Sequence, residues 1–277
     1  MFSTIAEAQA WARSQGVDRL DAQLLLAQMF AVDRAWLVTH DDQVLSEAQR
    51  QTFASQVSER TQDVPLAYLL GEKEFHGLRL QVSPAVLVPR PDTEMLVNWA
   101  LEILQTLPAE PAPRVVDLGT GSGAIALAIK HGAPHISMQM ADVSPDALAV
   151  AKANANRLGL DVGAHLGSWW HALPIDQLFD LVLSNPPYIA GGDPHLPALR
   201  HEPTLALTPG GDGLSSLQAI IDGAPERMRP GAWLLLEHGY DQAGPVAAML
   251  ARAGFEAIAN RRDLGDQPRV TGGRYPR

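Results

Sequence analysis

The first 72 residues carry the hydrophobic pattern of a helical bundle. Ile5, Ala8 and Trp11 recur at helical spacing, so one face of the opening helix is apolar. A second apolar run follows around residue 25. Ser46 followed by Gln49 has the pattern of a capping box, which predicts the start of another helix. These features predict a small helical domain over residues 1–72.

The hydrophobic period then changes from that of a helix to that of a strand. Apolar side chains fall near alternate positions over residues 73–89, beginning with Phe75, Leu78 and Leu80. Gly77 interrupts the run at a place that suits a tight turn. We therefore expect a β-hairpin that links two domains.

From residue 90 to residue 277, strand and helix patterns alternate. The buried strands Arg114–Leu118 and Phe179–Ser184 are followed by turns and helices, which predicts a mainly parallel sheet covered by helices on both faces. Phe255–Asn260 and Arg269–Tyr275 follow each other without a helix between them. This order predicts an antiparallel pair at the edge of an otherwise parallel α/β sheet.

The composition narrows the class of protein. Hydrophobic residues make up 46% and charged residues 19% of the 277 positions, as in an ordinary globular protein. There is no cysteine, which excludes disulfides, thiolate zinc sites and cysteine nucleophiles. The net charge of −10 argues against free nucleic acid as a partner, because that binding needs Lys and Arg. No apolar run approaches the roughly 18 residues that cross a bilayer, and Met1 to Gln15 lacks a secretory signal. We expect a cytoplasmic enzyme that acts as a monomer and has no membrane partner.

A glycine-rich turn after the first strand of the sheet is a candidate cofactor site. Its candidate binding residues are Asp117, Gly119, Thr120, Gly121, Ser122 and Gly123. Glycines permit a tight turn and a close approach of the backbone to a ligand at the N-terminus of a helix. Asp142, at the end of the next strand, is placed to accept hydrogen bonds from ribose hydroxyls. These features fit both NAD and S-adenosylmethionine. Asp117 favours S-adenosylmethionine, because a carboxylate suits its cationic amino-acid end and would repel a pyrophosphate.

The segment Asn185-Pro186-Pro187-Tyr188 follows a buried strand and points to the reaction. The prolines keep the backbone extended and remove two N–H donors. The Asn185 side-chain oxygen and the Pro186 carbonyl remain as acceptors beside the Tyr188 ring. Two acceptors can orient a planar –NH₂ group, which is otherwise a weak nucleophile, for attack on a methyl sulfonium. The segment therefore predicts N-methylation, and the histidine spacing predicts no metal site.

The chain resembles the bacterial protein-(glutamine-N5) methyltransferases that modify peptide chain release factors, over nearly its full length. The resembling segments are Val64 to Leu69 with Gly71, Glu74-Phe75, Pro89 to Glu94, Asp117 to Gly123, Asn185 to Ile189, Glu202-Pro203, Gly211 to Leu214, Leu236 to Gly239 and Asp263 to Arg274. The resemblance implies a Rossmann-like class I S-adenosylmethionine-dependent methyltransferase domain. Its sheet would have seven strands, mostly parallel, with an antiparallel C-terminal edge hairpin. The helical bundle would help to grip the protein substrate, the glutamine of a Gly-Gly-Gln loop in a class 1 release factor.

The resemblance also assigns roles to individual residues. Asn185, Pro186 and Tyr188 would be catalytic, and these three together with Pro187 would bind the substrate. Asn185 would also contact the cofactor. Trp169 is the best match for a ring that stacks on the adenine, although Ser168 departs from the acidic residue common at that place. His201 also departs from the family pattern, because the family commonly has an aromatic residue at this place before Glu-Pro.

The nearby charged residues Arg90, Asp92 and Glu94 fit two interpretations: they order a loop over the active site, or they cap the helix that begins there.

Four alternative functions remain at this point. A methyltransferase for a glutamine in a ribosomal protein would use the same chemistry. An adenine-N6 DNA methyltransferase would share the Asn-Pro-Pro-Tyr segment but should carry a basic groove. A non-catalytic binding module would show damage to the site, whereas these residues are present. A dehydrogenase would need a proton-relay residue, and the sequence nominates none.

Overall fold

The computed structural model describes residues 2–263 and 265–276. The chain divides into two compact units, Met1–Glu72 and Lys73–Arg277. No helix within the described residues is long and apolar enough to cross a membrane.

The first unit is helical. Its helices are α1 (Ile5–Ser14), α2 (Arg19–Phe30), α3 (Arg34–Thr39), α4 (Glu47–Thr61) and α5 (Leu66–Leu70). Ile5 and Phe53 are fully buried in its core, and the ring of Phe53 packs edge-on against Phe2. Ser46 and Gln49 form the predicted capping box at the start of α4.

A two-stranded hairpin opens the second unit. β1 (Glu72–Phe75) and β2 (Leu78–Gln81) are joined by His76 and Gly77. Both of these residues have positive φ, as a two-residue turn between twisted strands requires. The sequence predicted strand structure up to residue 89, and this is wrong for its second half. Residues 82–89 contain no strand, because Pro84 cannot continue the ladder. Val86 and Val88 are nevertheless buried, and burial explains the apolar alternation that the sequence showed.

The second unit contains a seven-stranded sheet with the order β5-β4-β3-β6-β7-β9-β8. The strands are β3 (Arg114–Leu118), β4 (Ser137–Asp142), β5 (Gly163–Leu166), β6 (Phe179–Ser184), β7 (Met228–Glu237), β8 (Glu256–Arg262) and β9 (Pro268–Arg274). β3 to β7 pair in parallel, and β9 is antiparallel to both β7 and β8. This confirms the predicted α/β sheet and its antiparallel edge.

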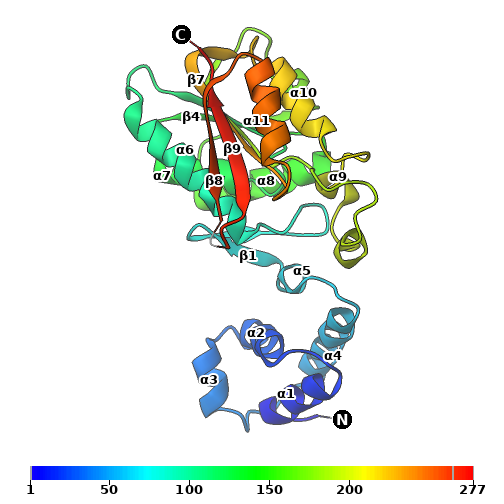
Figure 1. Cartoon of the computed structure of the whole chain (residues 1–277). Helices are drawn as coiled ribbons and strands as arrows, with labels where there is room; N and C mark the ends of the chain where they lie inside the picture. The colour runs from blue at the N-terminus through cyan, green and yellow to red at the C-terminus, as the bar shows by residue number, and fades with distance from the viewer. Residues whose placement is uncertain (1, 264, 277) are drawn as a thin grey trace. The chain divides into compact units, whose positions relative to one another are not determined.

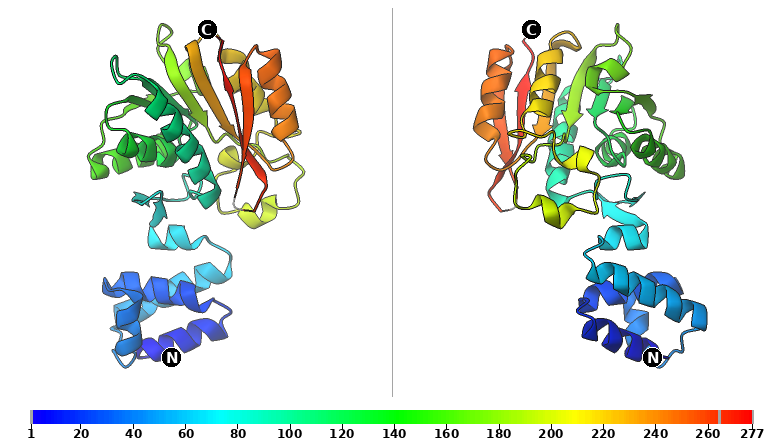
Figure 2. Two further views of the ribbon diagram at one scale, coloured as in Figure 1. Left: turned by 60° about the vertical axis from the view of Figure 1, so that its left-hand side comes forward. Right: turned by 90° about the vertical axis from the view of Figure 1, so that its right-hand side faces the viewer.

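Helices cover both faces of the sheet (Figures 1 and 2). The longer ones are α6 (Glu94–Thr106), α7 (Ala124–Gly132), α8 (Pro145–Leu158), α10 (Ser215–Gly223) and α11 (Ala243–Arg252). The shorter ones are η1 (Pro91–Thr93), η2 (Trp169–Ala172), η3 (Leu196–Leu199) and α9 (Thr204–Leu207). α6, α7 and α8 share one core with Leu181 and Leu183 of β6, whereas α10 and α11 share the other with Val182. Alternate residues of one strand thus enter opposite cores, which is why the strand is apolar throughout.

The topology brings two loops together. β3 and β6 are neighbours, and the chain turns away from them in opposite directions along the sheet. The hydroxyl of Ser184, at the end of β6, donates to the carbonyl of Leu118, at the end of β3, over 2.5 Å. The glycine turn and the Asn-Pro-Pro-Tyr segment therefore begin side by side at the carboxyl edge, where ligands bind in sheets of this kind.

Candidate active site

A cavity of about 340 Å³ lies at this carboxyl edge. The glycine turn, the ends of β4 and β5 and the start of the Asn-Pro-Pro-Tyr segment supply one part of its lining. The segments around residues 85–90 and 203–209 supply the rest. The cavity thus lies among loops that a rigid sheet positions.

The glycine turn is fixed by backbone bonds to the next strand. The N–H groups of Gly119 and Thr120 both donate to the carbonyl of Ala141, at 2.8 and 3.0 Å. One carboxylate oxygen of Asp142 accepts from the Gly121 N–H at 2.9 Å, and the other accepts from the Ser144 N–H at the same distance. Asp142 therefore braces the turn and also lines the cavity. Each of its oxygens has a second lone pair for a ligand.

Asp117 lies beneath the turn and does not line the cavity. Its carboxyl group is fully buried and accepts a 2.6 Å hydrogen bond from the Thr120 hydroxyl. Burial raises the pKa of Asp117 to about 7, against the opposing effect of that hydrogen bond. Its charge can reach a ligand only through the turn, so the expectation of a direct contact remains a prediction.

The two tryptophans of η2 have different environments. Trp169 is half-buried and lines the cavity, with its ring against the backbone of Gly119. Its φ is +44°, a conformation that costs energy in a residue with a side chain. Trp170 is buried in the core, and its indole N–H donates to the Ile220 carbonyl at 2.9 Å. Of the pair, Trp169 is the one that can contact a ligand.

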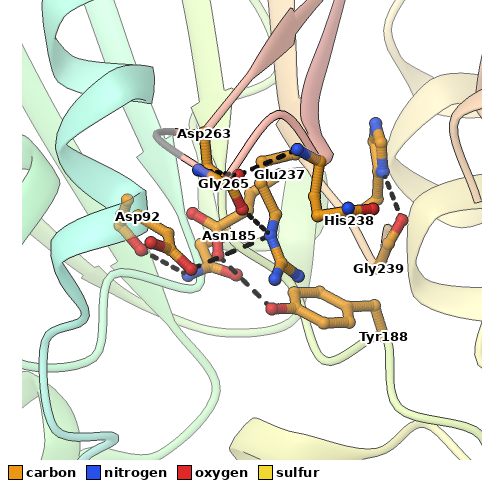
Figure 3. A network of polar contacts seen from close by, with 11 residues as sticks. Asp92, Asn185, Tyr188, Glu237, His238, Gly239, Asp263 and Gly265 are labelled. Atoms are coloured by element: carbon orange, nitrogen blue, oxygen red, sulfur yellow. Dashed lines mark hydrogen bonds and ion pairs between the residues drawn. The ribbon is translucent and has the colours of Figure 1, made fainter. Parts of the chain in front are cut away.

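The Asn-Pro-Pro-Tyr segment is held from several sides. The Asn185 Nδ2 donates to the hydroxyl of Thr93 at 3.2 Å, and the Tyr188 hydroxyl donates to Glu237 Oε1 at 3.4 Å (Figure 3). The Tyr188 carbonyl accepts from Gln242 Nε2 at 3.0 Å. Asn185 and Pro187 line the cavity, whereas Pro186 is buried and Tyr188 is half-buried outside its lining.

A charged network around the buried Glu237 lies next to this segment (Figure 3). Glu237, which ends β7, is almost fully buried. Burial raises its pKa to about 7, while the nearby hydroxyl of Thr93 and the charge of Arg269 oppose that rise. Arg269 pairs with Asp263 at 2.8 Å and lies 3.8 Å from Asp92. Burial is the larger cause and the charge of Glu237 the second cause that raise the pKa of Tyr188. Its hydroxyl therefore stays protonated and can donate a hydrogen bond.

Residues 90–94 combine features of both interpretations. Neither η1 nor α6 has a side-chain cap hydrogen bond, but Asp92 and Glu94 lie in their first turns, where a carboxylate stabilises the helix dipole. Arg90 pairs with the buried Glu202, and Glu94 accepts from the His76 N–H at 3.0 Å. Glu202 also accepts from the Val88 N–H at 3.0 Å. These bonds order the loop that lines the cavity.

The cavity thus unites most of the residues that the sequence nominated. Its lining includes Gly119, Thr120, Gly121, Ser122, Asp142, Trp169, Asn185 and Pro187, and it lacks Asp117, Gly123, Pro186 and Tyr188. A β-carbon on Gly123 would lie 3.0 Å from Leu127, so this glycine serves helix packing. Sequence reasoning assigned no site role to Thr93, Glu202 or Glu237. The signal was present, since all three lie in segments that carry the family resemblance.

The fold is that of a methyltransferase. The structure resembles the hMettl16 catalytic domain in complex with an RNA hairpin, with a TM-score of 0.59 and 17% identity, over 81% of this chain and 80% of that one. It also resembles a methyltransferase from Pyrococcus furiosus, with a TM-score of 0.56 and 16% identity, over 79% of this chain and all of the other. Residues 100–235 match the family model of the methyltransferase small domain. The sheet, the glycine turn and this match define a class I S-adenosylmethionine-dependent methyltransferase.

Sequence comparison identifies the family. Residues 5–71 match the PrmC N-terminal domain. The release factor glutamine methyltransferase of Bordetella pertussis is 45% identical over 93% of this chain and 95% of its own length. That of Xylella fastidiosa is 46% identical over 96% of both, and that of Coxiella burnetii 44% identical over 91% of this chain and 90% of its own length. The chain belongs to the release factor glutamine methyltransferase family. This membership decides for S-adenosylmethionine over NAD, and for an enzyme over a binding module.

Proposed function

We propose that this enzyme transfers a methyl group from S-adenosylmethionine to the side-chain amide nitrogen, N5, of the glutamine in the Gly-Gly-Gln motif of class 1 peptide chain release factors. The observation that carries the proposal is the position of Asn185, whose side chain lines the cavity at the carboxyl edge of the sheet. The family resemblance over both units supports the choice of a release factor over a ribosomal protein or adenine in DNA.

The groups around the cavity are of the chemical types that can bind the parts of S-adenosylmethionine. We assign the half-buried indole of Trp169 to the adenine and the carboxylate of Asp142 to the ribose hydroxyls. The turn from Gly119 to Ser122 offers close backbone approach to the amino-acid end. When bound, S-adenosylmethionine supplies an electrophilic methyl carbon next to a sulfonium centre. Asp117, buried below the turn, would be drawn toward its ionised form by the cationic end, because an opposite charge favours the carboxylate.

The chain's own residues would orient the acceptor amide. An amide nitrogen is a weak nucleophile because its lone pair is delocalised into the carbonyl. Asn185 Oδ1 and the Pro186 carbonyl would accept the two N–H hydrogens and hold the nitrogen in line with the methyl carbon. Tyr188 would pack against the plane of the amide. Positioning of this kind can supply an effective molarity of about 10⁵ M or more, and the proton can leave after transfer without a strong base.

The proposal is tested with labelled S-adenosylmethionine and two protein substrates. One is a class 1 release factor, and the other is the same factor with Gln→Ala in its Gly-Gly-Gln motif. Label is expected only in the first. Equal labelling of both, or of neither, would contradict the substrate assignment. A parallel incubation with ribosomal proteins checks the alternative substrate, and labelling confined to them would overturn the choice of release factors. Size-exclusion chromatography of the enzyme with and without the release factor tests the expected monomer.

A further inference from the structure

The Asn-Pro-Pro-Tyr segment has few backbone groups by which the fold can hold it. Pro186 and Pro187 have no N–H group, so the middle of the segment has no backbone donor. The start of the segment is fixed by β6, which pairs with β7 as far as Ser184. Its end is the peptide group between Tyr188 and Ile189. The contacts of this peptide group therefore help to decide where the Tyr188 ring lies.

That peptide group is bonded on both sides. The Ile189 N–H donates to the Leu207 carbonyl at 3.0 Å, and the Tyr188 carbonyl accepts from Gln242 Nε2 at 3.0 Å. Gln242 directly precedes α11, so its bond joins the loop after β6 to the loop after β7. The Tyr188 hydroxyl has a longer bond, 3.4 Å to Glu237. The two backbone bonds are thus the shorter contacts that place this residue.

The orientation of the Gln242 side chain follows from the backbone groups that it meets. Its Oε1 accepts from the Gly239 N–H at 2.9 Å. A backbone N–H can only donate and a carbonyl can only accept, so the amide oxygen must face Gly239 and the NH₂ group must face Tyr188. The backbone N–H of Gln242 also donates to the Gly239 carbonyl at 2.9 Å. Gln242 is buried, so the loss of either side-chain bond would leave a buried polar group without its partner.

Gly213 confines the same carbonyl from another loop. It has a φ of +83°, and a β-carbon on it would lie 2.2 Å from the Tyr188 carbonyl oxygen and 3.0 Å from Gln242 Nε2. The backbone of Gly213 therefore packs directly against the bonded pair. This leaves the Tyr188 carbonyl no room to move toward the loop before α10.

We propose that Gln242 is a positioning residue for methyl transfer. Its amide, together with the backbone of Gly213, holds the Tyr188 carbonyl and so fixes the ring that would pack against the acceptor amide. This inference rests on the proposed function. Neither Gln242 nor Gly213 lines the cavity, so Gln242 acts through Tyr188 and not by contact with cofactor or substrate.

The first test is Gln242→Glu, which keeps the shape of the side chain. The glutamate still accepts from the Gly239 N–H, but at pH 8 its carboxylate has no hydrogen for the Tyr188 carbonyl and repels it. With a release factor as substrate, kcat should fall by about 100-fold, the loss that a displacement of about 1 Å can cause. The affinity for S-adenosylmethionine, measured by calorimetry, should stay close to the wild-type value. Gln105→Glu makes the same change of charge at an exposed position on α6 and should keep the wild-type kcat.

A pair of glycine variants disturbs the same carbonyl without changing Gln242. Gly213→Ala should lower kcat, because the new β-carbon would push the Tyr188 carbonyl away from its partner. Gly210→Ala is the matched control: its φ is +81°, but nothing lies within 4 Å of its β-carbon. It carries the same backbone strain without the collision and should keep most of the wild-type kcat. This pair decides the matter if Gln242→Glu does not fold, and equal kcat values in the two variants would overturn the proposal.

The outcomes separate the two proposals. If the wild-type enzyme does not methylate the release factor, the proposed function fails. If it does and Gln242→Glu keeps the wild-type kcat, the positioning role is wrong. Equal losses of kcat and of cofactor affinity would also contradict it, because the damage would then extend to the whole cavity.

A double-mutant cycle shows whether Gln242 acts through the ring. Gln242→Glu is measured alone and in the Tyr188→Ala background, where it should lower kcat much less because the ring is already absent. The same loss of kcat in both backgrounds would exclude action through Tyr188.

Discussion

The indole of Trp169 lies so close to Gly119 that a β-carbon on the glycine would come within 3.2 Å of the ring. Gly119 also has a φ of +75°, which side chains disfavour. The turn below the cavity and the ring beside it therefore depend on each other. A larger residue at position 119 would strain the turn and displace the ring together.

Gly119→Ala should accordingly weaken S-adenosylmethionine binding by about tenfold or more, since the αL conformation costs an alanine about 1–2 kcal/mol before the ring moves. Isothermal titration calorimetry measures the affinity. Gly254→Ala is the matched control: its φ is +85°, but nothing lies within 4 Å of its β-carbon and it is outside the cavity lining. Equal affinities in the two variants would contradict the argument.

Removal of the Trp169 ring should affect cofactor binding, whereas removal of the Trp170 ring should affect the stability of the fold. Trp169→Ala should weaken cofactor binding by roughly tenfold, because stacking of an aromatic ring on a base contributes about 1–3 kcal/mol. Trp170→Ala should instead lower the free energy of unfolding by about 3–5 kcal/mol, as for a buried ring. Calorimetry and urea denaturation of both variants check this. A cofactor affinity unaffected by Trp169→Ala would exclude its contact with adenine.

Asn185→Ala should abolish turnover while cofactor affinity changes by less than about tenfold, which is about 1.4 kcal/mol. The side chain would orient the acceptor, whereas Trp169 and Asp142, which are assigned to the cofactor, lie elsewhere in the cavity. Methyl transfer and calorimetric binding are measured on the same preparation. Asn98→Ala, an exposed asparagine on α6, serves as the control and should be fully active. Turnover by Asn185→Ala would refute the proposed mechanism.

Stability should fall as the pH rises from about 4 to about 7. Burial raises the pKa of Asp117 and of Glu237 to about 7, so the folded protein holds protons that the unfolded chain releases near pH 4. The unfolded state then binds fewer protons, and the free energy of unfolding falls by up to about 1.4 kcal/mol per pH unit for each group. Urea denaturation at pH 5, 6 and 7 should show a smaller slope in Asp117→Asn. An unchanged slope would mean that Asp117 is ionised throughout.

Glu202 should prove important for the loop that lines the cavity. Glu202→Ala removes the partner of Arg90 and leaves the buried Val88 N–H unsatisfied, which should cost about 1–3 kcal/mol of stability. Glu202→Gln retains an acceptor and should be milder. Thermal or urea unfolding compares the two, together with cofactor affinity. If Glu202→Ala is as stable as wild type, the loop is ordered by other contacts.

Much of the fold followed from local patterns. The capping box at Ser46 is observed, because such a signal depends on residues a few positions apart. The limits of β6 agree with prediction for the same reason. The segment after the hairpin shows where prediction from local patterns fails. Val86 and Val88 alternate like a strand, but they are buried in an irregular loop, and burial alone produces the alternation.

The sequence by itself determined the glycine turn, Asp142 and the Asn-Pro-Pro-Tyr segment, because each of these sites is a short stretch whose chemistry depends on its own residues. Only the tertiary structure decided how they are supported. It placed Trp170 in the core and Trp169 at the cavity, and it showed that Thr93 contacts Asn185 and that Glu237 contacts Tyr188. A buried polar side chain must find a hydrogen-bond partner, and packing between elements far apart in the chain determines which partner is within reach.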